Sequence, residues 1–195
     1  AITRHDEAVF ERLCALLEVW KGTPCGKLFL TCNFTRVSIS QEDFAERIGE
    51  IAERYRFDHD RLIIEITEDS LIQNGEQAAA NIEACRKMGF KIAIDDMGSG
   101  FTALSDLYSH EIDLVKIERS VVLNAMTEKG ARMLKGLIAL AHDMGTRVLC
   151  EGVETAAQHE MIRETGCDMV QGFYYSRVLP LPEALRYLQS KGFIL

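Results

Sequence analysis

Polar and charged residues stand in or directly after apolar segments along this chain. Three segments, RKMGFKIAIDD, AHDMGTRVLCEG and RETGCDMVQGF, repeat one pattern: a helix that stops at glycine, an apolar strand, and then polar residues. The segments TCNF, LIIEITED and DLVKIE place polar residues similarly without the glycine. The residues that this pattern selects are Asn33, Glu65, Asp95, Asp96, Lys116, Glu151 and Gln171.

These side chains are suited to binding a cation. In a parallel α/β fold all strands point their carboxyl ends at one face, so residues distant in sequence meet there. Like charges gathered in a low-dielectric cleft raise one another's pKa or require a cation. Four carboxylates, two amides and a lysine at one place therefore predict a metal site.

Several of these residues also have a purely structural interpretation. Asp95 and Asp96 are typical of a turn, but Gly98 and Gly100 after the strand would also let the backbone turn and bring both carboxylates together to bridge two metals. Lys116 is either a buried lysine with a carboxylate or phosphate partner or an edge-strand lysine that reaches solvent. Glu154 can mark a helix start with Thr155 as its N-cap.

The overall composition limits the class of protein. The chain has 195 residues and lacks linker-like or low-complexity stretches, which predicts one domain over residues 1–195. Its formal charge of −8 argues against polymeric nucleic acid as a partner. A small anionic ligand remains compatible, because divalent cations held by carboxylates would make the site attractive to phosphate.

Location and cysteine chemistry are predicted from what the sequence contains. The longest apolar runs are shorter than the roughly 20 residues of a membrane span, and the amino-terminal segment is charged. These features predict a soluble cytoplasmic protein whose domain makes no membrane contact. The six cysteines form no CxxC pair and are interpreted as reduced core residues.

Apolar periodicity predicts alternating helices and strands. Helices are expected over about 6–21, from about 41 with Ser40 as N-cap, and over 75–88, 102–108, 128–144, 155–165 and 182–190. Strands are expected over 28–34, 62–67, 91–96, 114–117, 147–153 and 169–175. Six strands fit an open doubly wound sheet or a (β/α)₈ barrel whose first two strands precede Ala1. Functional residues after nearly every strand favour the barrel.

Six short motifs resemble one known family. NFT, EITED, DDMGSGFTALSDL, DLVKIERSVV, CEGVET and QGFYYSR occur in the order found in the EAL-domain family of cyclic di-GMP phosphodiesterases, over almost the whole chain. The resemblance implies an α/β fold of the modified TIM-barrel type. It also implies hydrolysis of cyclic di-GMP to linear pGpG, with two Mg²⁺ or Mn²⁺ ions that activate water.

The same resemblance implies a role for each matching residue. The implied metal ligands are Asn33, Glu65, Asp95, Asp96 and Glu151. Lys116 and Glu151 would act on the attacking water as catalytic residues. Gln171 would contact cyclic di-GMP with help from Glu154, and Glu68 would stabilise the loop after Asp96.

The sequence departs from the family pattern mainly at its start. The Glu-Ala-Leu motif of the first family strand is absent, so we expect an N-terminally incomplete domain that lacks its first one or two strands. MGSG in place of FGTG and KIE in place of KID keep the required chemistry. The alternative function is an inactive cyclic di-GMP receptor. A homodimer is expected, and the parent protein can carry a GGDEF or sensory domain.

Overall fold

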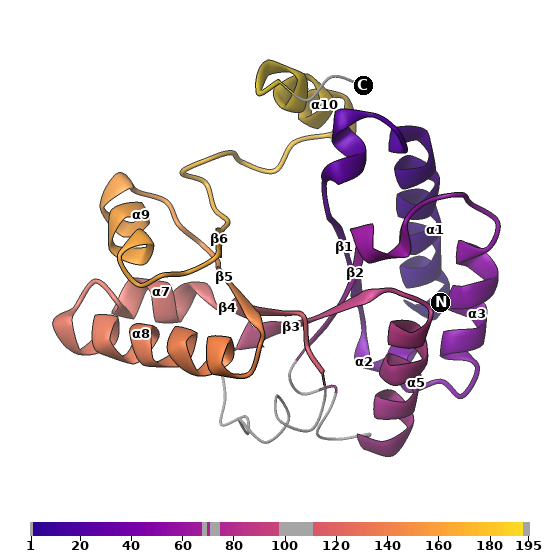
Figure 1. The fold of residues 1–195 in the computed structure, drawn as a ribbon, viewed down its shortest axis with the longest axis horizontal. Coiled ribbons are helices and arrows are strands. Elements are labelled where there is room, and N and C mark those ends of the chain that lie inside the picture. Colours follow the sequence, from indigo (N-terminus) through magenta and orange to yellow (C-terminus); the bar gives the residue numbers. More distant parts are fainter. Residues whose placement is uncertain (1, 68–69, 71–74, 98–110, 193–195) are drawn as a thin grey trace. The chain divides into compact units, whose positions relative to one another are not determined.

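The computed structural model describes residues 2–67, 70, 75–97 and 111–192 (Figure 1). The chain divides into two compact units. Unit 1 comprises residues 1–92 and 179–195, and unit 2 comprises residues 93–178. Within the described part of the chain, no helix is both long enough and apolar enough to cross a membrane.

Unit 1 contains two parallel strands and several helices. Strand β1 (Leu30–Phe34) pairs with β2 (Leu62–Thr67), and this register places Asn33 opposite Glu65. The helical elements are α1 (Ile2–Trp20), η1 (Pro24–Lys27), α2 (Arg36–Ile39), α3 (Phe44–Ala52), η2 (His59–Arg61), α5 (Gly75–Lys87) and α10 (Leu181–Ser190).

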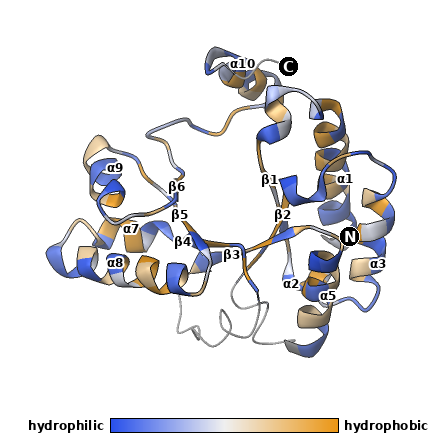
Figure 2. Ribbon diagram, in the orientation of Figure 1, coloured by the Kyte–Doolittle hydropathy of each residue, from blue (hydrophilic) through white to orange (hydrophobic). Residues whose placement is uncertain are grey.

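Aromatic side chains contact one another within the unit 1 core. The Phe10 ring of α1 lies 5.8 Å from that of Phe34 and 5.6 Å from that of Phe90, between ring centroids. Phe34 in turn meets Phe44 of α3 edge to face at 5.0 Å. Such tilted pairs stabilise beyond the area they bury. Helix α1 carries both hydrophobic and hydrophilic residues in Figure 2, as expected for a helix with one face on this core.

The Ser40 prediction is wrong. Ser40 ends helix α2, and α3 begins only after Asp43. Thr35 is the N-cap of helix α2, and its side chain accepts the Ser38 N–H. Its first turn is held by the buried Asp6, which accepts hydrogen bonds from the Thr35 and Ser38 hydroxyls at 2.9 and 2.5 Å. A partner 29 residues away in sequence cannot be recognised from local periodicity.

Unit 2 is a run of parallel strands joined by helices. Strands β3 (Lys91–Met97, of which residues 93–97 belong to unit 2), β4 (Leu114–Ile117), β5 (Arg147–Cys150) and β6 (Met169–Val170) pair in chain order. The connecting helices are α7 (Arg119–Asn124), α8 (Glu128–Asp143) and α9 (Ala156–Arg163). The predicted helix over 102–108 lies outside the described residues, and α7 was not predicted.

The repeated glycine pattern is confirmed. Gly89, Gly145 and Gly166 follow helices α5, α8 and α9 with φ of 96°, 77° and 81°. This left-handed backbone is accessible to glycine without a steric penalty, and it ends a helix. Each glycine therefore turns the chain from a helix toward the next strand.

The last two predicted strands are shorter than expected. Strand β5 ends at Cys150, and β6 contains only two residues. After Gln171 the chain turns, because the Tyr174 N–H donates to the Val153 carbonyl and the Tyr175 N–H donates to the Gly172 carbonyl. A methyl group at Gly172 would overlap the Val153 carbonyl oxygen, so this close approach requires glycine.

Asp168 anchors the segment before β6. Its Oδ2 accepts the Val148 N–H at 2.8 Å and lies 2.7 Å from His142 Nε2. Burial acts to raise the pKa of Asp168, but the hydrogen bonds with His142 and Val148 outweigh it, so the pKa is lower than usual. The carboxylate thus links β5, the end of α8 and the entry to β6.

Candidate active site

A bulge at the end of β3 brings two neighbouring carboxylates to one place. Ile94 pairs with Val115 and Met97 pairs with Ile117, so Asp95 and Asp96 together stand opposite the single residue between them on β4. That residue is Lys116. Two residues facing one is the definition of a β-bulge, a feature common beside active sites. A regular strand would have pointed the two side chains in opposite directions.

Asp96 completes this turn through its own backbone. It has φ of +59°, a left-handed conformation that is unusual for a residue with a side chain. Its N–H donates to Asp95 Oδ1 at 3.0 Å. The sequence pattern attributed the turn to glycines 98 and 100, which lie outside the described residues. Within β3, the bulge and Asp96 are sufficient to bring the carboxylates together.

Lys116 joins the carboxylates of two different strands. Its Nζ lies 3.0 Å from Asp95 Oδ1 and 2.8 Å from Glu151 Oε1. The Lys116 side chain is 7% exposed, and its partners are 15% and 22% exposed. Of the two readings of Lys116, the structure supports the buried lysine with carboxylate partners.

The β-ladder positions Glu151 beyond the end of β5. Its N–H donates to the Ile117 carbonyl at 3.0 Å, which continues the pairing of β4 with β5 by one residue. The side chain then leaves the strand where Lys116 can reach it. Asp95, Asp96 and Glu151 each offer an oxygen, and these oxygens all lie within 4.8 Å of one another.

The charges of this cluster fit a hard divalent cation. Three carboxylates and one ammonium leave a formal charge of −2 if all are ionised. Partial burial of its carboxyl, followed by the charges of Asp95 and Glu118, raises the pKa of Asp96 although Lys116 opposes this. Carboxylate oxygens are the preferred ligands of Mg²⁺, and a bound cation would compete with the proton at Asp96.

Asn33 and Glu65 form a second pair of predicted ligands. They lie opposite each other in the register of β1 and β2, within unit 1. Glu65 is buried, whereas Asn33 is exposed. Their convergence with the unit 2 carboxylates stays a prediction. Glu68 lies outside the described residues, so its predicted role is also untested.

Glu154 lies in a cap at the start of α9. Thr155 is the N-cap, as predicted, and forms a capping box with Gln158. Gln158 Oε1 accepts the Glu154 N–H at 2.7 Å, and the Glu154 carboxylate pairs with Arg119 at 2.9 Å. Sequence reasoning missed Arg119. The Arg119 side chain also packs against Gly152, and a side chain at position 152 would overlap it.

Gln171 lines an open pocket of unit 2. Its N–H donates to the Cys150 carbonyl at 2.9 Å, and its carbonyl accepts the Val153 N–H at 3.1 Å. The pocket has a volume of about 560 Å³. Phe173 and Arg177 also line it, with the guanidinium 4.9 Å from the ring centroid. Guanidinium and aromatic groups together suit a planar anionic ligand.

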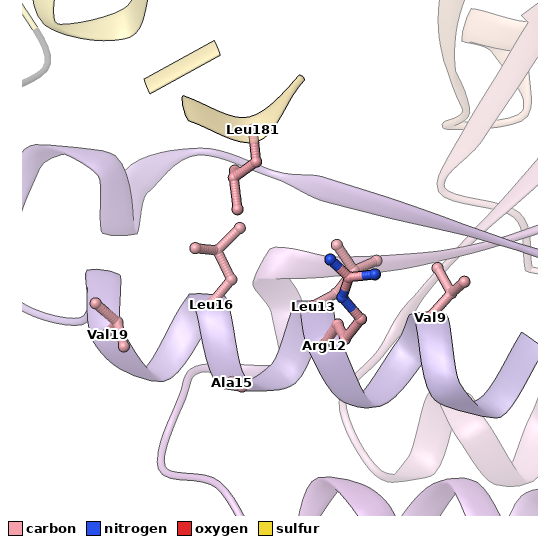
Figure 3. A pocket seen from close by; sticks show the side chains of 7 residues that line it. All are labelled: Val9, Arg12, Leu13, Ala15, Leu16, Val19 and Leu181. Atoms are coloured by element: carbon pink, nitrogen blue, oxygen red, sulfur yellow. The ribbon is translucent and has the colours of Figure 1, made fainter. Parts of the chain in front are cut away.

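A second pocket, on unit 1, has a different character. It has a volume of about 490 Å³ and lies along α1, where Leu181 of α10 points toward it (Figure 3). The lining residues are Val9, Arg12, Leu13, Ala15, Leu16, Val19 and Leu181. These side chains carry no oxygen ligand for a hard cation.

Comparison with known proteins identifies the class of fold and then the family. The solved structure of the PaMucR phosphodiesterase in complex with c-di-GMP superimposes with a TM-score of 0.87 and is 25% identical. The match covers 94% of this chain and 75% of that one. The fold is of the α/β class and is a TIM-like (β/α) barrel, as predicted.

Sequence relatives agree with this result. Cyclic di-GMP phosphodiesterase NbdA of Pseudomonas aeruginosa is 28% identical over 98% of this chain and 25% of its own length. Oxygen sensor protein DosP of Escherichia coli is 28% identical over 93% of this chain and 23% of its own length. The chain thus spans about a quarter of these curated relatives. The EAL domain family model matches residues 1–178, and the chain belongs to that family.

Proposed function

We propose that this chain is a metal-dependent phosphodiesterase that hydrolyses one phosphodiester bond of cyclic di-GMP to give linear pGpG. The observation that carries the proposal is the cluster of Asp95, Asp96 and Glu151 around the buried Lys116. Family membership supports it, as do the printed names of a cyclic di-GMP phosphodiesterase and of a c-di-GMP complex among the matches.

Two Mg²⁺ or Mn²⁺ ions are the proposed cofactors. Their proposed ligands are Asn33, Glu65, Asp95, Asp96 and Glu151. Bound divalent cations would lower the pKa of a water molecule and offset the charge of the phosphodiester.

Lys116 and Glu151 are the proposed catalytic residues. Lys116 already donates to Asp95 and Glu151, so its ammonium group fixes the orientation of both carboxylates. Its ammonium group would also stabilise the negative charge that develops on the phosphoryl oxygens. Glu151 would accept the proton of the attacking water as a general base.

The remaining roles concern the ligand and the parent protein. Gln171 and Glu154 would contact cyclic di-GMP, with Gln171 at the edge of the unit 2 pocket. Glu68 would stabilise the following loop. A cytoplasmic location, a homodimer, and a GGDEF or sensory domain in the parent protein remain part of this proposal.

The test is hydrolysis of cyclic di-GMP by the chain, followed by chromatography for pGpG. We expect turnover with Mg²⁺ or Mn²⁺ and none in EDTA. Asp95→Asn should lose at least a hundredfold in rate, because it removes a charged ligand at the cluster. Asp143→Asn is the matched control, since Asp143 is exposed on α8. Circular dichroism of both variants checks that they fold.

Calorimetric binding of cyclic di-GMP separates the two candidate functions. Binding without hydrolysis under all these conditions would overturn the enzyme proposal for this chain and favour the receptor. Equal rates of hydrolysis for Asp95→Asn and Asp143→Asn would instead show that the carboxylate cluster takes no part in the reaction.

A further inference from the structure

Two cysteine thiols are in contact at the end of β5. Cys150 is the last residue of β5, and Cys167 lies in the segment that leads into β6. Their Sγ atoms are 3.5 Å apart. Cys167 Sγ also lies 3.4 Å from the Val148 carbonyl oxygen and 3.1 Å from that of Met169. The sequence, in which 16 residues separate the two, gave no sign of this contact.

The two cysteines differ in their exposure to solvent. Cys150 is completely buried, whereas Cys167 is partly exposed. Cys14, Cys25, Cys32 and Cys85 are buried. Cys167 is therefore the residue of the pair that a small oxidant would meet first, and the Cys150 sulfur lies 3.5 Å from its own.

Cys167 also has the character of a nucleophilic thiol. The hydrogen bond with Cys150 is the largest influence on it and lowers its pKa, which outweighs the opposite effect of burial. By contrast, burial raises the pKa of Cys14 and of Cys85 to about 12. Because the thiolate is the reactive form, Cys167 should react well before those core cysteines.

We propose that Cys167 and Cys150 form a redox pair that a hydroperoxide converts to an intramolecular disulfide. The carboxylate cluster takes no part in this chemistry, so the inference is independent of the phosphodiesterase proposal. Closing the bond brings the sulfur atoms from 3.5 Å to about 2.05 Å. We expect rotation of the Cys167 side chain to supply this movement, because Cys167 lies outside the regular strands.

The reaction balances with one peroxide molecule per pair. The Cys167 thiolate attacks one oxygen of hydrogen peroxide, the O–O bond breaks, and hydroxide leaves and takes up a proton as water. Cys167 is now a sulfenic acid. The Cys150 sulfur then attacks the Cys167 sulfur, the S–O bond breaks, and the hydroxide leaves with the Cys150 proton as a second water.

The disulfide would join Cys150, which ends β5 directly before Glu151, to Cys167 at the entry of β6. That segment is already fixed to β5 by Asp168, which accepts the Val148 N–H at 2.8 Å. The existing bond keeps Cys167 beside β5 in the reduced protein. Closure therefore needs little ordering of the chain, which favours an intramolecular bond over reaction with a second molecule.

The test is controlled oxidation followed by mass spectrometry. The reduced chain is treated with hydrogen peroxide in small excess, free thiols are alkylated, and non-reduced peptides are mapped. We expect the loss of two alkylatable thiols, a mass lower by two hydrogen atoms, and one linked peptide pair containing residues 150 and 167. Dithiothreitol should restore both thiols.

Three variants assign the roles. Cys150→Ser, which keeps a hydrogen-bond donor beside Cys167, should leave a Cys167 sulfenic acid that dimedone traps, and Cys167→Ser should abolish the reaction. Cys85→Ala is the matched control and should behave as the parent chain. If the parent chain gains oxygen without a linked peptide, or links other cysteines, the proposal is wrong. This result needs no variant, so a misfolded variant would not obscure it.

Discussion

Removal of the Lys116 ammonium group should destabilise the protein, and a divalent cation should reverse much of that loss. Lys116→Met keeps the length of the side chain and removes its charge. Asp95 and Glu151 then lose the cation that lies 3.0 and 2.8 Å from their oxygens. Without the ammonium group, the carboxylates of Asp95, Asp96 and Glu151 repel one another in a partly buried site.

The expected size of this effect follows from burial. Removing one partner of a fully buried ion pair costs about 3–5 kcal/mol. The Asp95 and Glu151 side chains are 15% and 22% exposed, so water can solvate part of their charge. We therefore expect a loss of about 2–3 kcal/mol in the free energy of unfolding. This corresponds to a decrease of roughly 4–12 °C in Tm for a protein of this size.

The assay is thermal and urea unfolding in EDTA and in Mn²⁺. Lys135→Met is the matched control, because Lys135 is exposed on α8, and it should change stability by less than about 0.5 kcal/mol. Mn²⁺ should stabilise Lys116→Met more than the parent chain, since the variant cluster carries one more net negative charge. Equal stabilisation of both, or equal loss in the two lysine variants, would refute the reasoning.

Three further predictions concern the frame around the site. Folding lowers the pKa of Asp168, so its contribution to stability should be complete above about pH 4 and should disappear as the pH falls through the folded-state pKa. Urea unfolding should therefore show that Asp168→Asn lowers the free energy of unfolding at pH 7 and that this difference shrinks below pH 4. Thr155→Ala should cost about 1 kcal/mol in the same measurement, because it removes the α9 capping box. Gly172→Ala should lower Tm, since its methyl group would overlap a backbone carbonyl, whereas Gly136→Ala, with open space around it, should leave Tm unchanged or higher.

The elements that the sequence predicted well are those with local causes. β2 and β4 match their apolar runs, and the three helix-ending glycines have the expected left-handed backbone. Helix α2 was missed because a distant carboxylate, Asp6, holds its first turn. The predicted extent of β6 was wrong because Gly172 packs on another backbone segment. Long-range contacts therefore decided the boundaries that periodicity could not.

The same distinction applies to the site. Charged residues next to apolar strands identified Asp95, Asp96, Lys116 and Glu151, and the structure brings these four together. No local signal indicated the β3 bulge, because it depends on the register with β4. Arg119 was overlooked because its partner Glu154 is 35 residues away and belongs to another motif. Recognition of a family motif supplied roles, but it did not supply these contacts.

The left-handed backbone of Asp96 lowers the stability of the fold, whereas the proposed activity requires the Asp96 carboxylate. An L-residue in this conformation costs about 1–2 kcal/mol compared with a right-handed one, although aspartate tolerates it better than most. Glycine would relieve that cost and remove the carboxylate at the same time. A laboratory evolution experiment that selects only for heat resistance should therefore accumulate Asp96→Gly. The same experiment with selection for turnover should retain aspartate, so position 96 would record which pressure was applied.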